Sequence, residues 1–379
     1  MRGHTSVPLH SLGLVPVSVP PISLMPPMLS RSSDLVDWVR PREATSVGRV
    51  STESAPTPVP APCSTGDAAV LTRSRAELAA ALAAAPGPRA VVMTMGALHE
   101  GHFDLVREAA RRVGPAGTVV VTIFVNPLQF APTEDLDSYP RDLEGDLAGL
   151  TRTLAGTDGA LGLGRLIVFA PTPEVIYPAG QPAVRIAPGP IATVLEGRTR
   201  PTHFAGVCQV VLTLMHLTAP RWALFGRKDA QQLAIIEAMV RDLAVPLEIV
   251  PVDIRRESDG LAMSSRNAYL SPEQRRQALA LSRALRAGRD AAAQTSGARP
   301  DPAAIRRAAL ASLEAADGVE IDYVALVDPA GFEDLADAGL GLPRSEPVGE
   351  ELPAVGLLAV AARVGTTRLI DNTLIDLRP

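Results

Sequence analysis

The chain has 379 residues, of which 46% are apolar and 3% aromatic, and its 36 basic and 41 acidic residues give a net charge of −5. The length predicts two domains with appendages, and the lack of a basic stripe argues against nucleic acid as the main partner. No stretch resembles a transmembrane helix, and the two cysteines, Cys63 and Cys208, are too few for a disulfide framework, so we expect a cytoplasmic protein without membrane contact.

Residues 1–66 hold 11 of the 35 prolines and show no sustained periodicity. This composition predicts a disordered extension, or residues that lie upstream of the true start. Five prolines interrupt the apolar stretch 12–28, and no clear cleavage site follows it, so we do not expect a signal peptide.

From residue 67 onward, apolar strands alternate with helices. We expect strands at 89–95, 118–125, 165–169, 222–225 and 247–254, and helices at 73–85, 100–113, 204–217 and 230–243. Apolar strands without polar alternation, separated by helices, predict an α/β domain with a parallel sheet covered on both faces.

The pattern changes after Arg255. Helices at 272–289 and 302–315, and strands at 319–327, 357–364 and 367–375, predict a smaller α+β domain with its own sheet. We place the boundary near Ile254, which gives domains 67–254 and 255–379. The Gly-rich stretches 156–164 and 339–353 are expected to be surface insertions.

A histidine pair follows the strand 89–95. The segment Met93-Thr-Met-Gly-Ala-Leu-His-Glu-Gly-His102 lies where a strand ends and a helix begins, which is where ligands bind in open α/β sheets. His99 and His102 can face one side of the first helical turn and, with free N–H groups, could hold a triphosphate. Capping or surface histidines explain the pair about equally well. Zinc is a weaker hypothesis, because no third ligand cluster has suitable spacing.

Lys228 is the only lysine of the chain, and it also lies between a strand and a helix, in Phe225-Gly-Arg-Lys-Asp-Ala-Gln-Gln232. This position makes a solvated surface lysine a weak explanation. An ammonium close to a phosphoryl group, with Asp229 for ribose hydroxyls or a metal, is consistent with a nucleotide site.

Two further segments carry polar side chains of interest. In Gly260–Asn267, two serines and an arginine suit phosphate oxygens, although a capping serine pair with a surface arginine is a strong alternative. In Phe124–Phe130, the amides of Asn126 and Gln129 could hold a hydroxy acid, although an Asn-Pro turn is the simpler explanation. Asparagine occurs only at positions 126, 267 and 372.

Seven segments, in the same order, strongly resemble the pantothenate synthetase family of the His-x-Gly-His nucleotidyltransferase group. They are Thr94–His102, Phe124–Phe130, Asp135–Arg141, Arg200–Gly206, Lys228–Gln232, Asp259–Asn267 and Gly365–Asn372. The resemblance, which runs from about residue 68 to the C-terminus, implies a Rossmann-like domain, a smaller C-terminal domain that closes over it as a lid, and usually a homodimer. It also implies Mg²⁺ and an ATP-dependent condensation of (R)-pantoate with β-alanine to pantothenate, through pantoyl adenylate, with release of AMP and pyrophosphate.

Carried over position by position, the resemblance gives individual residues a role. His102, His99 and Lys228 would act in catalysis, with His102 as the catalytic acid. The ATP site would comprise Met95, Gly96, Ala97, Leu98, His99, Glu100, Gly101, His102, Gly226, Arg227, Lys228, Asp229, Arg255, Met263, Ser264, Ser265 and Arg266. Pantoate would be bound by Gln129, Gln232, Asn126, Tyr139 and Arg200, supported by His203, and β-alanine by Gln129. No metal ligands can be assigned.

Four positions depart from the family pattern. Met93 stands where proline is usual, Arg227 where glutamate is usual, Ala230 where tyrosine is common, and Arg255 where an apolar residue usually touches the adenine region. Because the key polar residues remain, we expect altered affinity rather than lost chemistry.

Three other functions are consistent with parts of the pattern. A nucleotidyltransferase that acts on a phosphorylated cofactor precursor would favour added cations where Gln129 and Gln232 stand. A class I aminoacyl-tRNA synthetase would need a basic tRNA-binding surface, which the sequence does not predict. A catalytically weakened nucleotide-binding or regulatory protein would bind ATP without pantoate-dependent turnover.

Overall fold

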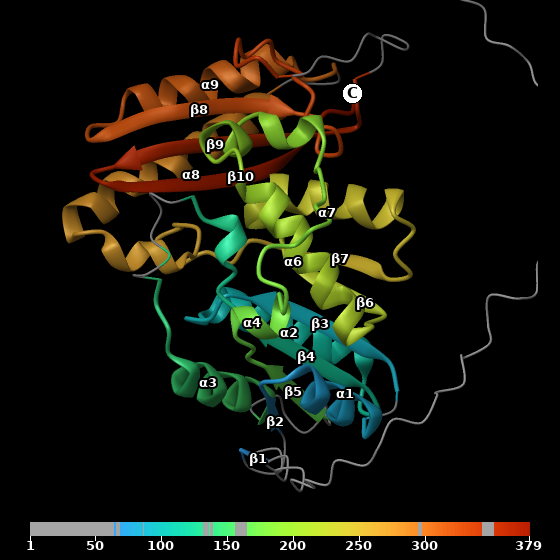
Figure 1. The fold of residues 1–379 in the computed structure, drawn as a ribbon. Coiled ribbons are helices and arrows are strands. Elements are labelled where there is room, and N and C mark those ends of the chain that lie inside the picture. Colours follow the sequence, from blue (N-terminus) through green and yellow to red (C-terminus); the bar gives the residue numbers. More distant parts are fainter. Residues whose placement is uncertain are drawn as a thin grey trace, which may run out of the picture. The chain divides into compact units, whose positions relative to one another are not determined.

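The structure is a computed structural model that describes residues 64–65, 69–85, 87–131, 136, 139–155, 165–294, 298–342 and 352–379 (Figure 1). The predicted insertion 156–164, most of the extension 1–66 and most of the stretch 339–353 lie outside these residues, as do Cys63 and Asp135. Within the described residues, no helix is long and apolar enough to cross a membrane.

Seven strands among the described residues form the first sheet. They are β1 (Ser64–Thr65), β2 (Ala69–Thr72), β3 (Arg89–Thr94), β4 (Thr118–Ile123), β5 (Arg165–Phe169), β6 (Trp222–Gly226) and β7 (Glu248–Val252). Their order is β1-β2-β5-β4-β3-β6-β7, and every neighbouring pair is parallel except β1 and β2. The predicted parallel sheet is confirmed, and the chain reverses its direction of travel across the sheet at β3, between β4 and β6.

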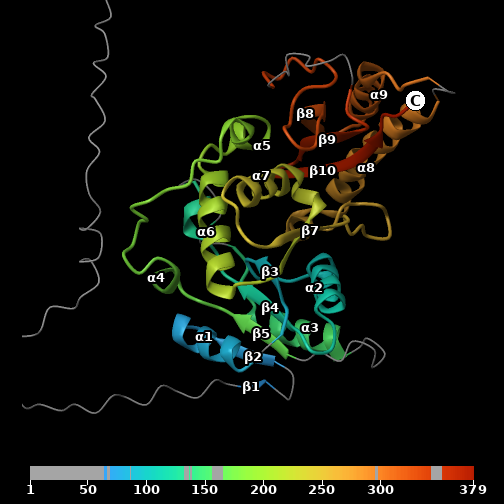
Figure 2. The same cartoon turned by 90° about the vertical axis from the view of Figure 1, so that its right-hand side faces the viewer.

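The helices of this part are α1 (Arg75–Ala83), α2 (Glu100–Val113), α3 (Leu143–Ala155), α4 (Pro173–Ile176), α5 (Glu196–Thr199), α6 (His203–Thr218) and α7 (Ala230–Asp242), with 3₁₀ turns η1 (Pro127–Gln129), η2 (Pro190–Thr193) and η3 (Arg227–Asp229). Successive residues of a strand face opposite sides of the sheet. Ala90 and Val92 therefore pack with α2 and α3, while Val91 packs with α1, α6 and α7 (Figure 2). The helix α3 was not predicted, because Gly145 and Gly149 weaken its helical pattern.

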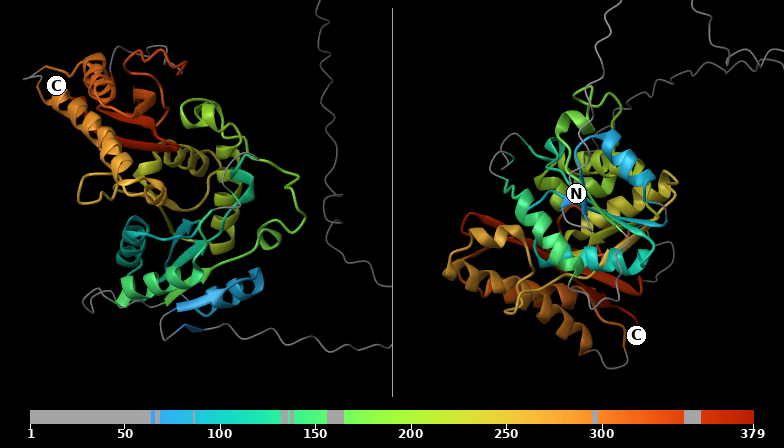
Figure 3. Two further views of the ribbon diagram at one scale, coloured as in Figure 1. Left: turned by 90° about the vertical axis from the view of Figure 1, so that its left-hand side faces the viewer. Right: turned by 90° about the horizontal axis from the view of Figure 1, so that it is seen from below.

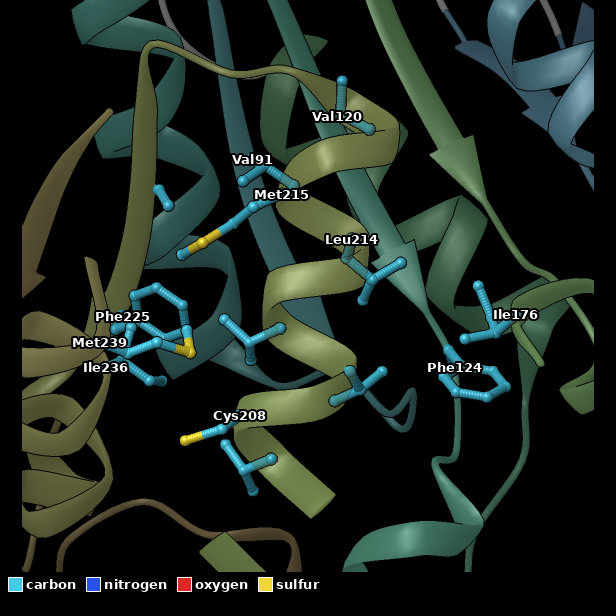
Figure 4. Close-up of a cluster of buried hydrophobic side chains, with 14 of the residues drawn as sticks. Val91, Val120, Phe124, Ile176, Cys208, Leu214, Met215, Phe225, Ile236 and Met239 are labelled. Atoms are coloured by element: carbon cyan, nitrogen blue, oxygen red, sulfur yellow. The ribbon is translucent and has the colours of Figure 1, made fainter. Parts of the chain in front are cut away.

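Aliphatic side chains on α6 fill the core on one face of the sheet. Leu214 and Met215 lie over strand residues Val91 and Val120 (Figure 4). Cys208 is fully buried in the same cluster, and burial raises the pKa of its thiol to about 11. Burial of each leucine or methionine side chain of this cluster contributes about 1.5–3 kcal/mol to the free energy of unfolding. Cys208 therefore has a packing role.

A three-stranded antiparallel sheet forms the second part, in the order β10-β9-β8. It contains β8 (Val319–Val327), β9 (Val355–Val364) and β10 (Thr367–Asp376), and it follows η4 (Ser265–Tyr269), α8 (Pro272–Ala293) and α9 (Pro302–Glu314). One face packs against α8 and α9, and the other packs against the segment around Leu195 and Ala234 of α7 (Figure 3). The predicted separate sheet is confirmed, whereas the domain boundary near Ile254, which follows β7, stays a prediction.

Candidate active site

A tightly held loop follows β3, at the point where the strand order reverses. Gly96 and Ala97 both have positive φ, 89° and 52°. A Cβ at Gly96 would lie 3.2 Å from the Asp146 carboxylate, so the closeness of that carboxylate favours glycine. Asp146 accepts hydrogen bonds from the backbone amides of Ala97, at 3.1 Å, and Leu98, at 2.7 Å. A carboxylate on α3 therefore fixes the path of the predicted ATP loop.

Two histidines replace the usual serine and glutamate of a capping box at the start of α2. His99 Nδ1 accepts a hydrogen bond from the amide of Gly101 at 3.2 Å, and His102 Nδ1 accepts one from the amide of His99 at 3.3 Å. A ring nitrogen that accepts has no hydrogen, so the proton of each neutral ring lies on Nε2. The ring centroids are 4.1 Å apart. The pair therefore offers two neutral N–H donors.

The electrostatic surroundings keep these rings uncharged. Burial, followed by His99 and Lys228, lowers the pKa of His102 to about 3. Burial and then Lys228 also lower the pKa of His99. A Cβ at Gly101 would lie 3.0 Å from the His99 ring, which explains the glycine between the histidines. At neutral pH, both rings act as hydrogen-bond donors rather than cations.

Lys228 lies in the turn η3 at the end of β6, with its Nζ 3.7 Å from Asp229 Oδ1. Partial desolvation raises the pKa of Asp229, whose side chain is 52% exposed, but the positive charges of Lys228 and Arg266 have the larger effect, so its pKa is lowered overall. Asp229 is therefore ionised at neutral pH. The guanidinium of Arg227 instead forms an ion pair with Asp253 at 3.2 Å, beyond the end of β7. Arg227 does not line the cavity around Lys228.

A cavity of about 580 Å³ brings several predicted residues together. This volume is in the usual range for small-molecule sites. The lining includes seven residues that the sequence singled out: Arg200, His203, Lys228, Asp229, Gln232, Ser264 and Arg266. Residues 366–372, from the start of β10, line it from the other side, as does Ala230, one of the four departures. Both sheets therefore contribute to one site.

Gln129 is joined by a hydrogen bond to His203, which lines this cavity. Asn126 Nδ2 donates to Gln129 Oε1 at 3.2 Å, and Gln129 Nε2 lies 3.0 Å from the sulfur of Met95. His203 Nδ1 donates to the Gln129 carbonyl at 3.0 Å, and Arg200 donates to His203 Nε2 at 3.2 Å. Because a carbonyl only accepts and a guanidinium only donates, the hydrogen of this imidazole lies on Nδ1.

Other predicted residues have different surroundings. Tyr139 packs edge-on against Phe130, with ring centroids 6.0 Å apart. Glu100 forms an ion pair with Arg107 at the start of α2. Arg255 forms an ion pair with Asp104 at 3.2 Å. Gly226, Met263 and Ser265 belong to the motifs but do not line the cavity, and the same is true of residues 95–102, Asn126 and Gln129. Their predicted contacts with ATP or pantoate stay predictions.

All three asparagines are buried, with exposed fractions of 1% for Asn126, 9% for Asn267 and 5% for Asn372. Each uses its amide nitrogen for two hydrogen bonds near a motif. Asn126 donates to Gln129 and Gly206 O. Asn267 donates to Glu257 and Ala262 O, and Asn372 donates to the carbonyls of Arg227 and Lys228. Their scarcity in the sequence was therefore a usable signal, although their partners were not predictable.

Sequence reasoning missed several residues that hold the site. Asp146 was overlooked because its helix was not predicted. A bidentate ion pair joins Arg256 to Asp371, at 2.7 and 3.0 Å. A second cluster joins Arg368 to Glu196 and Asp322, with Tyr323 donating to Glu196 at 2.9 Å. No group of three or more His, Cys, Asp or Glu side chains in the described ranges is placed to hold a metal ion.

The fold and the cationic and N–H-rich site together are those of a nucleotide-binding α/β enzyme. Comparison with known proteins narrows this class. The family described as Pantoate-beta-alanine ligase matches residues 71–374. A pantothenate synthetase of Nocardioides sp. is 49% identical over 311 residues, which cover 80% of this chain and 85% of the relative. Pantothenate synthetase 4 of Frankia alni is 54% identical over 284 residues, which cover 75% and 82%.

Solved structures of similar proteins point to the same family. Pantothenate synthetase from Thermus thermophilus is 42% identical, with a TM-score of 0.67 over 82% of this chain and 99% of that chain. Pantoate-beta-alanine ligase from Francisella tularensis, solved with Beta-gamma ATP and beta-alanine, is 27% identical, with a TM-score of 0.58 over 80% and 97%. The chain belongs to the pantoate–β-alanine ligase (pantothenate synthetase) family, and it condenses pantoate with β-alanine at the expense of ATP.

Proposed function

We propose that the condensation proceeds in two half-reactions, through an enzyme-bound pantoyl adenylate. In the first, a carboxylate oxygen of pantoate bonds to the α-phosphorus of ATP, and pyrophosphate leaves. In the second, the neutral amine of β-alanine attacks the activated carbonyl carbon. The bond between that carbon and the adenylate oxygen breaks, AMP leaves with the oxygen, and the amine loses its extra proton. No covalent bond to the protein is needed.

The observation that carries this proposal is that the charge of Lys228 acts on both His99 and His102, and that each of these rings keeps its hydrogen on Nε2. The Lys228 ammonium and the Nε2–H groups of His99 and His102 can share the negative charge that grows on the departing pyrophosphate. Ser264, Ser265 and Arg266 would hold further phosphate oxygens, and Asp229 and the backbone of Gly226 would hold the ribose. Residues Met95 to Gly101 of the loop after β3 would line the nucleotide-binding site.

The predicted role of His102 as an acid takes a more specific form. With a pKa of about 3, the imidazole has no extra proton to give at neutral pH. It would donate a hydrogen bond from Nε2 to a phosphoryl oxygen. A bound triphosphate would raise its pKa, since a nearby negative charge favours the protonated ring.

Uncharged amides would recognise pantoate. Gln129 and Gln232 would contact its carboxylate and hydroxyls, and Gln129 would also lie near β-alanine. Because all polar atoms of Asn126 have protein partners, it would act on pantoate by orienting Gln129. Arg200 and His203 are joined to the Gln129 carbonyl, and they would support the same wall together with Tyr139.

Mg²⁺ would enter with ATP. This ion usually keeps several waters and is bound largely through substrate phosphates, so it does not need a three-residue cluster of protein ligands. When bound, Mg²⁺ neutralises charge on the triphosphate. We also include in the proposal a homodimer in the cytoplasm and a C-terminal part that closes over the adenylate, which excludes water from a hydrolysis-prone intermediate.

Isotope transfer tests the adenylate directly. Pantoate labelled with ¹⁸O in its carboxylate is turned over with ATP and β-alanine, and AMP is analysed by mass spectrometry. The proposal predicts one labelled oxygen in AMP. Label in inorganic phosphate would indicate an acyl phosphate instead, and turnover with unlabelled AMP and phosphate would exclude both activated carboxylates.

A further inference from the structure

Two consecutive residues of β10, Asp371 and Asn372, contact both phosphate-binding motifs. Asp371 accepts the bidentate ion pair from Arg256, and Asn372 donates to the Lys228 turn. The backbone amide of Asn372 also donates to Asp371 Oδ1 at 2.8 Å, which joins the Asp371 side chain to the backbone of Asn372. One point of the C-terminal sheet is therefore bonded to segments that are far apart in the sequence.

On the Asp371 side, the contact reaches the hairpin that precedes Ser264. Arg256 donates to the carbonyl of Gly260 at 3.1 Å and pairs with Ala262 as an isolated antiparallel bridge. The amide of Met263 donates to the carbonyl of Arg255 at 2.9 Å. Ser264 follows directly and caps η4 by accepting a hydrogen bond from the amide of Arg266. Asp371 therefore fixes the base from which Ser264 and Arg266 extend.

On the Asn372 side, the contact reaches the only lysine. Asn372 Nδ2 donates to the carbonyl of Arg227 at 3.0 Å and to that of Lys228 at 2.9 Å. An amide nitrogen has two hydrogens, and this geometry uses both. The side chain of Asn372 is buried, so water cannot readily replace these bonds. Two successive carbonyls held by one side chain fix the orientation of the turn that carries the Lys228 side chain.

We propose that Asn372 is a positioning residue that sets Lys228 at the correct distance from Ser264 and Arg266, so that all three reach one triphosphate. This inference rests on the proposed phosphate contact of Lys228. The inference goes beyond that contact, because it assigns the alignment of the phosphate-binding groups to Asn372, whose two amide hydrogens are both donated to protein carbonyls. Thr373, the next residue on β10, is half-buried, does not line the cavity, and provides a matched control.

A double-mutant cycle separates positioning from general stabilisation. We would measure kcat and KM for ATP in pantoate-dependent pyrophosphate exchange for the wild type, Asn372→Ala, Lys228→Ala, the double variant and Thr373→Ala. Asn372→Ala should lower kcat/KM roughly 10- to 100-fold, as expected for a misplaced catalytic group. In the Lys228→Ala background, the same change should cost less than about twofold, because the group that Asn372 positions is gone. Thr373→Ala should match the wild type.

Multiplicative effects of the two substitutions would overturn the proposal, as would an unaffected Asn372→Ala variant or an equal loss in Thr373→Ala. If Asn372→Ala does not fold, Asn372→Ser replaces it, since serine keeps one donor and should show an intermediate loss. A wild type without exchange would refute the proposed function. In that case, the affinity for ATP is measured by calorimetry for the same set of variants. Non-additive losses of binding free energy would support the positioning role, and additive losses would overturn it.

Discussion

The Nδ1 atom of His102 accepts a hydrogen bond from the backbone amide of His99 at 3.3 Å, and this bond fixes which nitrogen of the imidazole carries the proton. The ring therefore has two separate tasks. Nδ1 caps the first turn of α2, and Nε2–H is available to a ligand. Because different atoms perform these tasks, substitutions can separate them.

We predict that His102→Asn and His102→Gln fail in different ways. The asparagine oxygen can take the place of Nδ1 and keep the cap, but no donor reaches the Nε2 position. This variant should stay within about 1 kcal/mol of wild-type stability and lose roughly 10²- to 10³-fold in exchange rate. Glutamine reaches the Nε2 position but loses the cap, so it should keep more activity and less stability. Thermal unfolding and exchange assays on both variants check this. Full activity of His102→Asn would contradict the account.

We predict a pH dependence of stability that disappears with His102. Its pKa is lowered from 6.5 to about 3, chiefly by burial, so the unfolded chain binds more protons than the native state between these pH values. The free energy of unfolding should therefore decrease as the pH falls below 6.5, by up to about 1.4 kcal/mol per pH unit for this group. Urea unfolding at pH 7.5 and pH 5.0 gives the difference. The difference should be smaller in His102→Asn, and an unchanged difference would mean that His102 titrates normally.

Asp146→Asn should loosen the loop after β3. An asparagine can accept one of the two amide hydrogen bonds, but its nitrogen would face the other amide N–H. Hydrogen bonds to charged groups contribute about 1.5–3 kcal/mol, so we expect a stability loss of that order and weaker ATP binding. Calorimetric titration with ATP and thermal unfolding measure both effects. Glu144→Gln, an exposed acid in the same first turn of α3, is the control and should change neither.

The Arg256–Asp371 ion pair should respond asymmetrically to truncation. The side chain of Asp371 is 2% exposed and that of Arg256 is 33% exposed. Arg256→Ala leaves a buried carboxylate without its cation and should cost about 3–5 kcal/mol. Asp371→Ala leaves an arginine that can reach water, so its cost should be smaller. Denaturant unfolding of both variants tests the order, and a larger cost for Asp371→Ala would contradict it.

Local patterns predicted the main elements closely. The predicted bounds of α2, β5 and β8 agree with the structure to the residue, since each has a clear apolar period and a clear end. The short strands β1 and β2 and the helices α3, α4 and α5 were missed, because they are short or interrupted by glycine. Lys228, Asn267 and Asn372 line the cavity and Asn126 holds Gln129, but their predicted roles in ligand binding stay predictions.

Long-range contacts were beyond the reach of the sequence. Asp146 holds a loop 48 residues earlier, and Asn372 holds a turn 144 residues earlier. Two departures from the family pattern also needed the structure. Arg227 and Arg255 form ion pairs with Asp253 and Asp104, and neither residue lines the cavity. The partners of these side chains depend on packing between segments that no local pattern joins.

The most direct test is pantoate-dependent ATP–pyrophosphate exchange without β-alanine, followed by AMP release when β-alanine is added. Wild type is compared with Lys228→Ala and with Arg241→Ala, which removes an exposed positive charge from α7. The account predicts exchange that requires pantoate, AMP release stimulated by β-alanine, a loss of roughly 10²-fold or more in Lys228→Ala and no loss in Arg241→Ala. Absence of exchange in a folded, ATP-binding wild type, or equal activity of all three proteins, would contradict it.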